Sequence, residues 1–159
     1  MRKSTKNGLG FSLGVILLAT PMVANFEGTF LTSYADPVGI PTVCMGETDR
    51  ELVMRERFTE QECMAVLGAS LTQHAIAVSS CLDRPLQAHE AAAVLSWTYN
   101  VGVHAACNST LVRKLNAGAP PAEWCAELDR WVYAGGRRLN GLVKRRAAER
   151  RMCETGTWE

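Results

Sequence analysis

Residues 26–42 read FEGTFLTSYADPVGIPT and contain two carboxylic acids, Glu27 and Asp36. Within residues 33–47, apolar and polar side chains alternate around the Gly and Pro residues of positions 37–41. Alternation with a period of two, interrupted by such residues, is typical of short strands joined by a tight turn. The stretch therefore predicts a short hairpin or small sheet that follows Glu27 and carries Asp36 in its turn.

This pair of acids suits one kind of chemistry. Glycoside hydrolysis uses a protonated carboxyl that donates to the leaving oxygen and an opposing carboxylate that stabilises an oxocarbenium-like centre or activates water. Glu27 ends an apolar stretch, which favours the protonated form, whereas Asp36 lies in a polar turn that keeps it ionised. The hydroxyl group of Thr42 could orient a water between them. On chemistry alone the signal is weak, because any protein contains many pairs of acids.

The remainder of the chain predicts helices. Thr59 and Glu62 match a capping box, and the apolar residues behind them keep a helical period. Further helices are expected to begin at Pro85, at Asn108 or Ser109 and at Pro120-Pro121, and a basic last helix is expected to run from the Gly135-Gly136 break to Cys153. The predicted fold class is α+β, mostly helical, with a small N-terminal β-sheet.

Six cysteines in 159 residues are many for a reduced cytoplasm, and they form no C-x-x-C pair. Their number and wide spacing favour disulfides in an oxidising compartment, with buried free thiols as the alternative. Sequence does not select among the fifteen possible pairings. We expect each cysteine to pair with its neighbour in the sequence.

The N-terminus resembles an export segment. Arg2, Lys3 and Lys6 precede an apolar run at residues 9–24, and no acid occurs before Glu27. As a helix this run spans about 24 Å, short of the roughly 30 Å hydrocarbon core of a bilayer. It is further weakened as an anchor by Gly10, Ser12, Gly14, Thr20 and Pro21.

Three interpretations of this segment remain open. A cleavable signal would be cut after Ala24, but Met22 is bulkier than the small residue that such sites prefer. An uncleaved segment would be a reversible membrane anchor. The run could also be the buried first helix of a domain. We expect an uncleaved export segment at residues 1–25 that is also the start of the first helix, followed by a catalytic domain at residues 26–159.

Residues 26–42 also resemble the active-site signature of the phage-type lysozymes, glycoside hydrolase family 24. That signature has Glu, eight residues, Asp, five residues and Thr, which Glu27, Asp36 and Thr42 match without a gap. Four later stretches, within residues 99–102, 108–111, 130–136 and 141–146, are similar to stretches of lambdoid-phage endolysins. The resemblance covers about residues 26–153.

The resemblance implies a lysozyme-like fold and a muramidase that cuts the β-1,4 bond between N-acetylmuramic acid and N-acetylglucosamine in peptidoglycan, causing host lysis for phage release. It makes Glu27 the general acid, Asp36 the second carboxylate and Thr42 the partner of the attacking water. It also implies signal-anchor release from the host inner membrane, on its periplasmic side, into the periplasm. Since no cysteine precedes Cys44, release would act by repacking rather than by thiol exchange.

Two departures from relatives are visible in the sequence. Many relatives have Gly-His-Thr where this chain has Gly46-Glu47-Thr48, so an ion pair made by that histidine is in doubt. Many also carry basic residues in the stretch occupied here by residues 29–32, which affects contacts at the edge of the groove. Neither departure touches Glu27, Asp36 or Thr42.

Other functions are less well supported. A lytic transglycosylase needs a single Glu, so Asp36 and Thr42 argue against it, and a non-catalytic membrane-disrupting protein would act through the basic C-terminal helix. We expect a monomer that needs no metal or organic cofactor and binds no nucleic acid. The residues interpreted as ordinary core or surface positions are His74, His89, His104, Trp97, Trp124 and Trp131.

Overall fold

The computed structural model describes residues 11–159, so Arg2, Lys3, Lys6 and Gly10 of the N-terminal segment lie outside the described residues. The elements run as follows: α1 (Leu13–Glu27), β1 (Phe30–Ala35), β2 (Pro41–Cys44), α2 (Arg50–Val53), α3 (Glu60–Ser79), α4 (Ala88–Val101), α5 (Val103–Cys107), α6 (Thr110–Asn116), α7 (Pro121–Cys125), a 3₁₀ helix (Ala126–Arg130), β3 (Tyr133–Ala134), β4 (Arg137–Arg138) and α8 (Asn140–Thr155). The mostly helical α+β class is therefore confirmed.

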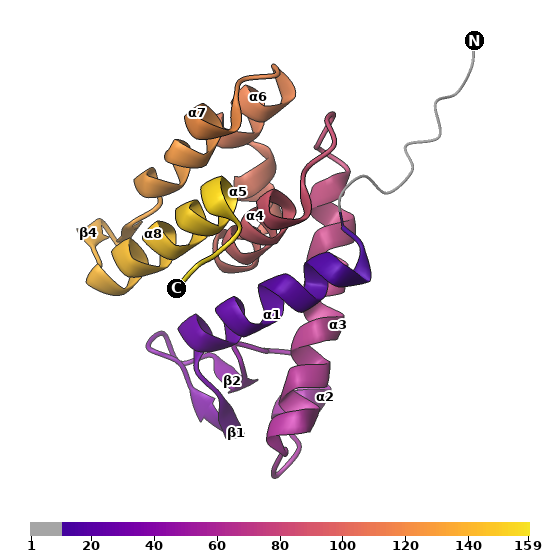
Figure 1. Cartoon of the computed structure of the whole chain (residues 1–159). Coiled ribbons are helices and arrows are strands. Elements are labelled where there is room, and N and C mark those ends of the chain that lie inside the picture. The colour runs from indigo at the N-terminus through magenta and orange to yellow at the C-terminus, as the bar shows by residue number, and fades with distance from the viewer. Residues whose placement is uncertain (1–10) are drawn as a thin grey trace.

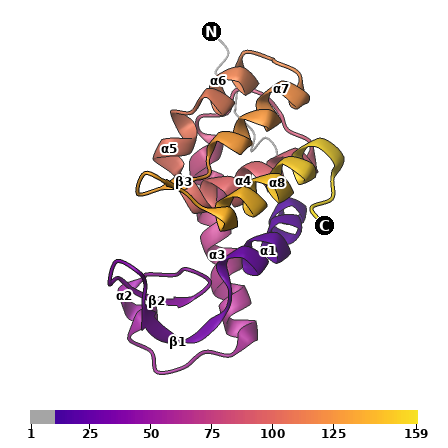
Figure 2. The same cartoon turned by 90° about the vertical axis from the view of Figure 1, so that its left-hand side faces the viewer.

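The elements form two groups joined by the long helix α3. Figure 2 shows β1, β2 and α2 at one end of the molecule and α4 to α8 at the other. Helix α1 crosses α3 between the two groups (Figure 1) and packs against both α3 and α4. Helix α4 also contacts α8, so it lies at the centre of the helical group. The C-terminal end of α1 consequently lies where the two groups meet.

The expected hairpin is present. Strands β1 and β2 are antiparallel, with Tyr34 opposite Thr42 and an irregularity in register between Phe30 and Tyr34. In the turn, one carboxylate oxygen of Asp36 accepts hydrogen bonds from the backbone N–H groups of Val38 and Ile40, at 2.9 and 2.8 Å. This side-chain-to-backbone bonding is a common reason for aspartate in turns. Asp36 therefore fixes the hairpin as well as lying at its tip.

Helix α1 buries one apolar face and exposes the other. The buried residues are Val15, Ile16, Ala19, Met22 and Val23. On the opposite side, Leu13 is 74% and Leu17 is 64% exposed. The helix ends at Gly28, whose φ of +72° suits glycine and whose N–H donates to the carbonyl oxygen of Ala24. Among residues 11–159, no helix is both long and apolar enough to cross a bilayer.

Several helix boundaries confirm the sequence signals, and others correct them. The capping box of Thr59 and Glu62 begins α3, and Ser109 caps α6. The second long helix begins at Ala88 rather than at Pro85, because Gln87 and Glu90 form a capping box of their own. Helices α2 and α5 were not expected from the sequence. Gly135-Gly136 was expected to be only a break, whereas these glycines form the turn between β3 and β4.

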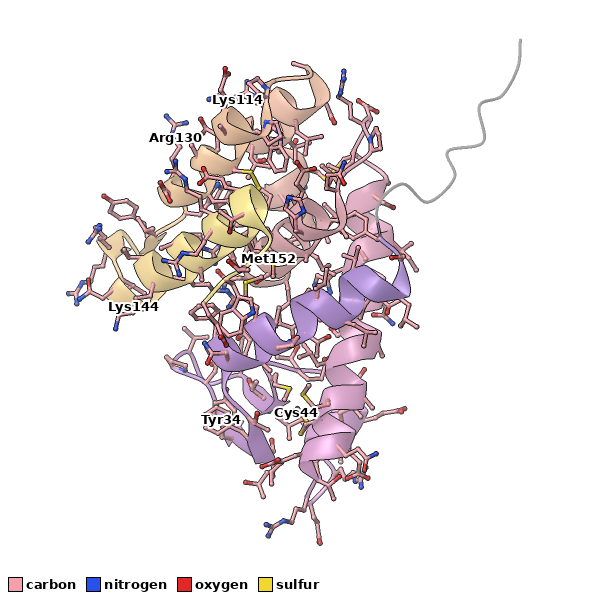
Figure 3. All side chains as sticks on the ribbon, in the orientation of Figure 1. Tyr34, Cys44, Lys114, Arg130, Lys144 and Met152 are labelled. Carbon is pink, nitrogen blue, oxygen red and sulfur yellow. A yellow bond between two sulfur atoms is a disulfide. The ribbon has the colours of Figure 1, made fainter. Side chains whose placement is uncertain are left out.

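The three disulfides confirm pairing between sequence neighbours. Cys44–Cys63 joins β2 to α3 (Figure 3), Cys81–Cys107 joins the end of α3 to α5, and Cys125–Cys153 joins α7 to α8. They close loops with sequence separations of 19, 26 and 28 residues. Each bridge thus connects two elements that follow one another closely in the chain. Burial of Trp97 and Trp124 is confirmed as well.

Reduction of the disulfides should lower thermal stability sharply. A bridge that closes a loop of this length contributes about 3 kcal/mol, so loss of all three should lower the melting temperature by about 20 °C or more. Thermal unfolding followed by circular dichroism, with and without a thiol reductant, measures the difference. Thiol titration of the unreduced, unfolded protein is the control and should find no free thiol. A melting temperature that reduction leaves unchanged would contradict a stabilising role.

Candidate active site

Glu27 is the last residue of α1 and lies where α1, the segment after β2 and α8 meet. One carboxylate oxygen accepts a hydrogen bond from Arg145 of α8 at 2.5 Å. The other oxygen faces Gly46, where an added Cβ atom would lie 3.4 Å from it. Gly46 has a φ of +86°, so both its backbone conformation and the close approach of Glu27 favour glycine. The side chain of Glu27 remains 21% exposed, so it is reachable from solvent.

The surroundings of Glu27 are more polar than the sequence suggested. Sequence reasoning considered the apolar helix that precedes Glu27, and it missed the guanidinium group of Arg145. Arg145 is 118 positions away and its side chain is 5% exposed. Its guanidinium carbon also lies 5.7 Å from the centre of the Phe26 ring, within the range of a cation–π contact. An ion pair of this sequence separation has no local sequence signal, although Arg145 belongs to a stretch that resembles relatives.

Asp36 and Thr42 lie at opposite ends of the same turn. The Asp36 carboxylate is held by two backbone N–H groups, as described above, and the residue is partly exposed. Thr42 is 4% exposed, and its hydroxyl donates a hydrogen bond to the carbonyl oxygen of Ile40 at 2.9 Å. Because the hydroxyl proton of Thr42 is already donated within the hairpin, only the lone pairs of its oxygen are available to accept a hydrogen bond from a water.

Tyr34 experiences the charges of both carboxylates, Glu27 and Asp36. No role was expected for it from the sequence. It lies on β1 (Figure 3), and the strand register places it opposite Thr42. Its pKa is raised, first by burial and then by the negative charges of Glu27 and Asp36. The charges of both carboxylates therefore act on the pKa of this one side chain. Tyr34 lies inside the signature stretch, and that location was the available signal.

Tyr99 of α4 closes the site from the other side. Its hydroxyl donates a hydrogen bond to the carbonyl oxygen of Met45 at 2.7 Å, which ties the segment after β2 to the helical group. Burial raises the pKa of Tyr99 most, and the charges of Glu27 and Glu47 raise it further. Glu47 accepts hydrogen bonds from the backbone N–H groups of Thr48 and Asp49. Its carboxylate thus shapes this loop.

The arrangement combines a carboxyl group in a partly buried ion pair with a second carboxylate in a polar turn. Glycoside hydrolysis requires such a pair, one carboxyl group that donates a proton and a second carboxylate that stabilises positive charge or activates water. Within residues 11–159, no group of three or more His, Cys, Asp or Glu side chains is arranged to hold a metal ion. His74 illustrates the ordinary roles of histidine here, because its ring bonds the Ser70 carbonyl oxygen and contacts Tyr99.

Comparison with known proteins identifies the family of the chain. The model of the phage lysozyme family matches residues 24–149. A SAR-endolysin of Enterobacteria phage P21 is 33% identical over 162 residues, covering 98% of this chain and 96% of that protein. The structure of an endolysin from Escherichia coli O157:H7 phage FAHEc1 has a TM-score of 0.78 and 26% identity, covering 100% of this chain and 97% of that one.

A third similarity comes from outside the phage endolysins. The muramidase domain of SpmX from Asticaccaulis excentricus has a TM-score of 0.76 and 27% identity, covering 91% of this chain and 97% of that domain. Fold, site and sequence therefore define a lysozyme-type glycoside hydrolase. The chain belongs to the phage lysozyme family, and the substrate of this family is peptidoglycan.

Proposed function

We propose that this chain is an endolysin that hydrolyses the β-1,4 bond between N-acetylmuramic acid and N-acetylglucosamine, and that it lyses the host cell for phage release. The observation that carries the proposal is the position of the Glu27 carboxylate between Arg145 and Gly46, next to a hairpin whose turn holds the Asp36 carboxylate. The endolysin names of the relatives support it. Peptidoglycan of the host wall is the expected partner.

The proposed roles follow from the positions of the three side chains. Glu27 donates a proton to the glycosidic oxygen, a role that its partly exposed carboxyl group, held at the end of α1 by Arg145, can perform. Asp36 stabilises the positive charge that develops on the sugar ring. The lone pairs of the Thr42 hydroxyl accept a hydrogen bond from the attacking water, since its proton is donated to Ile40.

We propose that, after export, the protein is first anchored in the host inner membrane. Residues 1–25 form the export and signal-anchor-release segment, and residues 26–159 form the catalytic domain. Three leucines of α1, Leu13, Leu17 and Leu18, are exposed in the folded enzyme and would be covered by lipid in the tethered form. The SAR-endolysin name of the P21 relative supports this interpretation.

Release would assemble the site. Glu27 is the last residue of α1, so a membrane-embedded α1 would hold it away from Arg145. Once α1 leaves the bilayer, its apolar face packs against α3 and α4, and Glu27 reaches Arg145. The tethered form is then inactive on the periplasmic side of the inner membrane, and the released form is active in the periplasm. We propose that the enzyme acts as a monomer and without nucleic acid.

The basic C-terminal region is proposed to be largely a solvated surface. Several of its cations are neutralised locally, since Lys114 and Arg130 pair with Glu127, and Arg150 pairs with Asp129.

Digestion of purified peptidoglycan tests the proposed reaction, because hydrolysis leaves glycan fragments that end in a reducing N-acetylmuramic acid.

A further inference from the structure

The basis for a further inference is a buried carboxylate, Glu149, that no proposed catalytic step uses. Its side chain is 0% exposed, on the inner face of α8 against α4. One of its oxygens accepts a hydrogen bond from the Ser96 hydroxyl at 2.7 Å and another from Arg145 at 3.1 Å. Burying an ionised carboxylate is costly unless it is paired and hydrogen-bonded. Glu149 meets this condition through its contacts with Arg145 and Ser96, which fix the three groups relative to one another.

Arg145 is fixed at three points, and Glu149 supplies one of them. The Nε atom of Arg145 donates to Glu149, and Nη2 donates to the backbone carbonyl oxygen of Ser96 at 3.2 Å. Nη1 then points at Glu27, at 2.5 Å. Since a guanidinium group is planar, two fixed nitrogens determine the position of the third. Ser96 contributes twice, through its carbonyl oxygen to Arg145 and through its hydroxyl to Glu149.

We infer that Glu149 is a positioning residue for the general acid: together with Ser96 it orients Arg145, and Arg145 orients the Glu27 carboxyl group. The inference rests on the proposed role of Glu27. Glu149 also divides the positive charge of Arg145 between two carboxylates, so that Glu27 does not receive all of it. Burial raises the pKa of Glu149, and the neighbouring charges of Arg146 and Arg145 oppose this.

Other ionisable groups near this chain of contacts come from four further elements or loops. Arg146 of α8 lies 3.1 Å from the second oxygen of Glu149 and donates to the Asn100 side chain. The remaining groups are Tyr99 on α4, Tyr34 on β1, Asp36 in the hairpin turn and Glu47 after β2. Tyr99, Tyr34, Asp36 and Glu47 do not lie between Glu149 and Arg145, because Arg145 donates directly to Glu149. A change at Glu149 therefore reaches Glu27 through Arg145.

The test is Glu149→Gln, assayed on soluble glycan fragments across a range of pH. Glutamine keeps the shape but replaces one acceptor oxygen by an NH2 group and removes the charge, so it holds Arg145 less firmly than the carboxylate does. We expect kcat to fall by about tenfold or more at unchanged KM, because displacing a catalytic group by small distances is costly. The alkaline limb of the pH–activity profile should also move to lower pH, because a nearby negative charge that disfavours ionisation of a second carboxyl group has been removed.

Two variants make the result decisive. Glu154→Gln removes a carboxylate from the same helix that pairs with solvent-exposed Arg150, and it should leave kcat and the pH profile as in the parent. Ser96→Ala deletes the hydroxyl that holds Glu149 while keeping the backbone carbonyl, and it should lower kcat at unchanged KM. If Glu149→Gln does not fold, Ser96→Ala decides. A parental kcat and pH profile in the folded variant would overturn the inference, whereas an active Glu27→Gln variant would overturn the proposed function itself.

Discussion

Replacing Glu27 with glutamine should lower lytic activity by about two to four powers of ten, the usual contribution of a general acid. Glutamine has the shape of glutamate and can still accept a hydrogen bond from Arg145, so the fold should be kept. What it lacks is the proton that the glycosidic oxygen must receive. The measurement is the fall in turbidity of permeabilised cells, with wall binding and the melting temperature recorded alongside.

A matched control separates this effect from a general effect of removing a charge. Glu123 lies on the exposed surface of α7, and Glu123→Gln should retain parental activity. If Glu27→Gln retains activity within tenfold of the parent, Glu27 is not the general acid. If it is inactive in turbidity assays on permeabilised wall and yet lyses whole cells, the protein acts by membrane disruption.

Raising the apolar character of α1 should abolish lysis by keeping the chain in the membrane. Gly14 is exposed, and a Cβ atom added there would meet only ordinary contacts, the nearest being Ser12 Oγ at 3.5 Å. Thr20 is partly buried, and its hydroxyl bonds within the helix to the carbonyl oxygen of Ile16. Gly14→Leu with Thr20→Leu therefore suits the folded helix. Each leucine favours lipid by about 1 to 2 kcal/mol.

Fractionation after collapse of the membrane potential measures this effect. The parent should move at full length from the membrane to the soluble periplasm, whereas the double leucine variant should stay with the membrane and fail to lyse. Gly14→Ser with Thr20→Ser, which alters the same positions without adding apolar surface, should be released like the parent. A soluble, active form that begins at Asn25 would show ordinary signal cleavage and exclude release of the intact segment.

The sequence was most informative where structure is set locally. The capping box of Thr59 and Glu62, the Ser109 cap and the Asp36 turn depend on residues within a few positions of one another, and all three form as expected. Pro85 was misleading, because the Gln87 and Glu90 pair lies close by and offers a better helix start. Short elements such as α5 have too few residues to show a period.

The two acids of the candidate site could be predicted from the sequence, whereas the residues that surround and position Glu27 could not. Glu27, Asp36 and Thr42 could be selected because they lie within one short stretch that matches a known signature. Arg145, Tyr99 and the Gly46 contact could not, since they reach Glu27 across the fold from α8, α4 and the segment after β2. Long-range contacts of this kind depend on how helices pack, and periodicity alone does not determine helix packing.

The central claim, hydrolysis of a specific glycosidic bond, is tested most directly by mass spectrometry of the products released from purified peptidoglycan. The account predicts fragments that end in N-acetylmuramic acid with a reducing end, which borohydride converts to the alcohol, and no such fragments from Glu27→Gln. Fragments ending in a 1,6-anhydro sugar, which borohydride leaves unchanged, would show a lytic transglycosylase. Fragments ending in reducing N-acetylglucosamine would show cleavage of the other glycosidic bond, and either result would contradict the account.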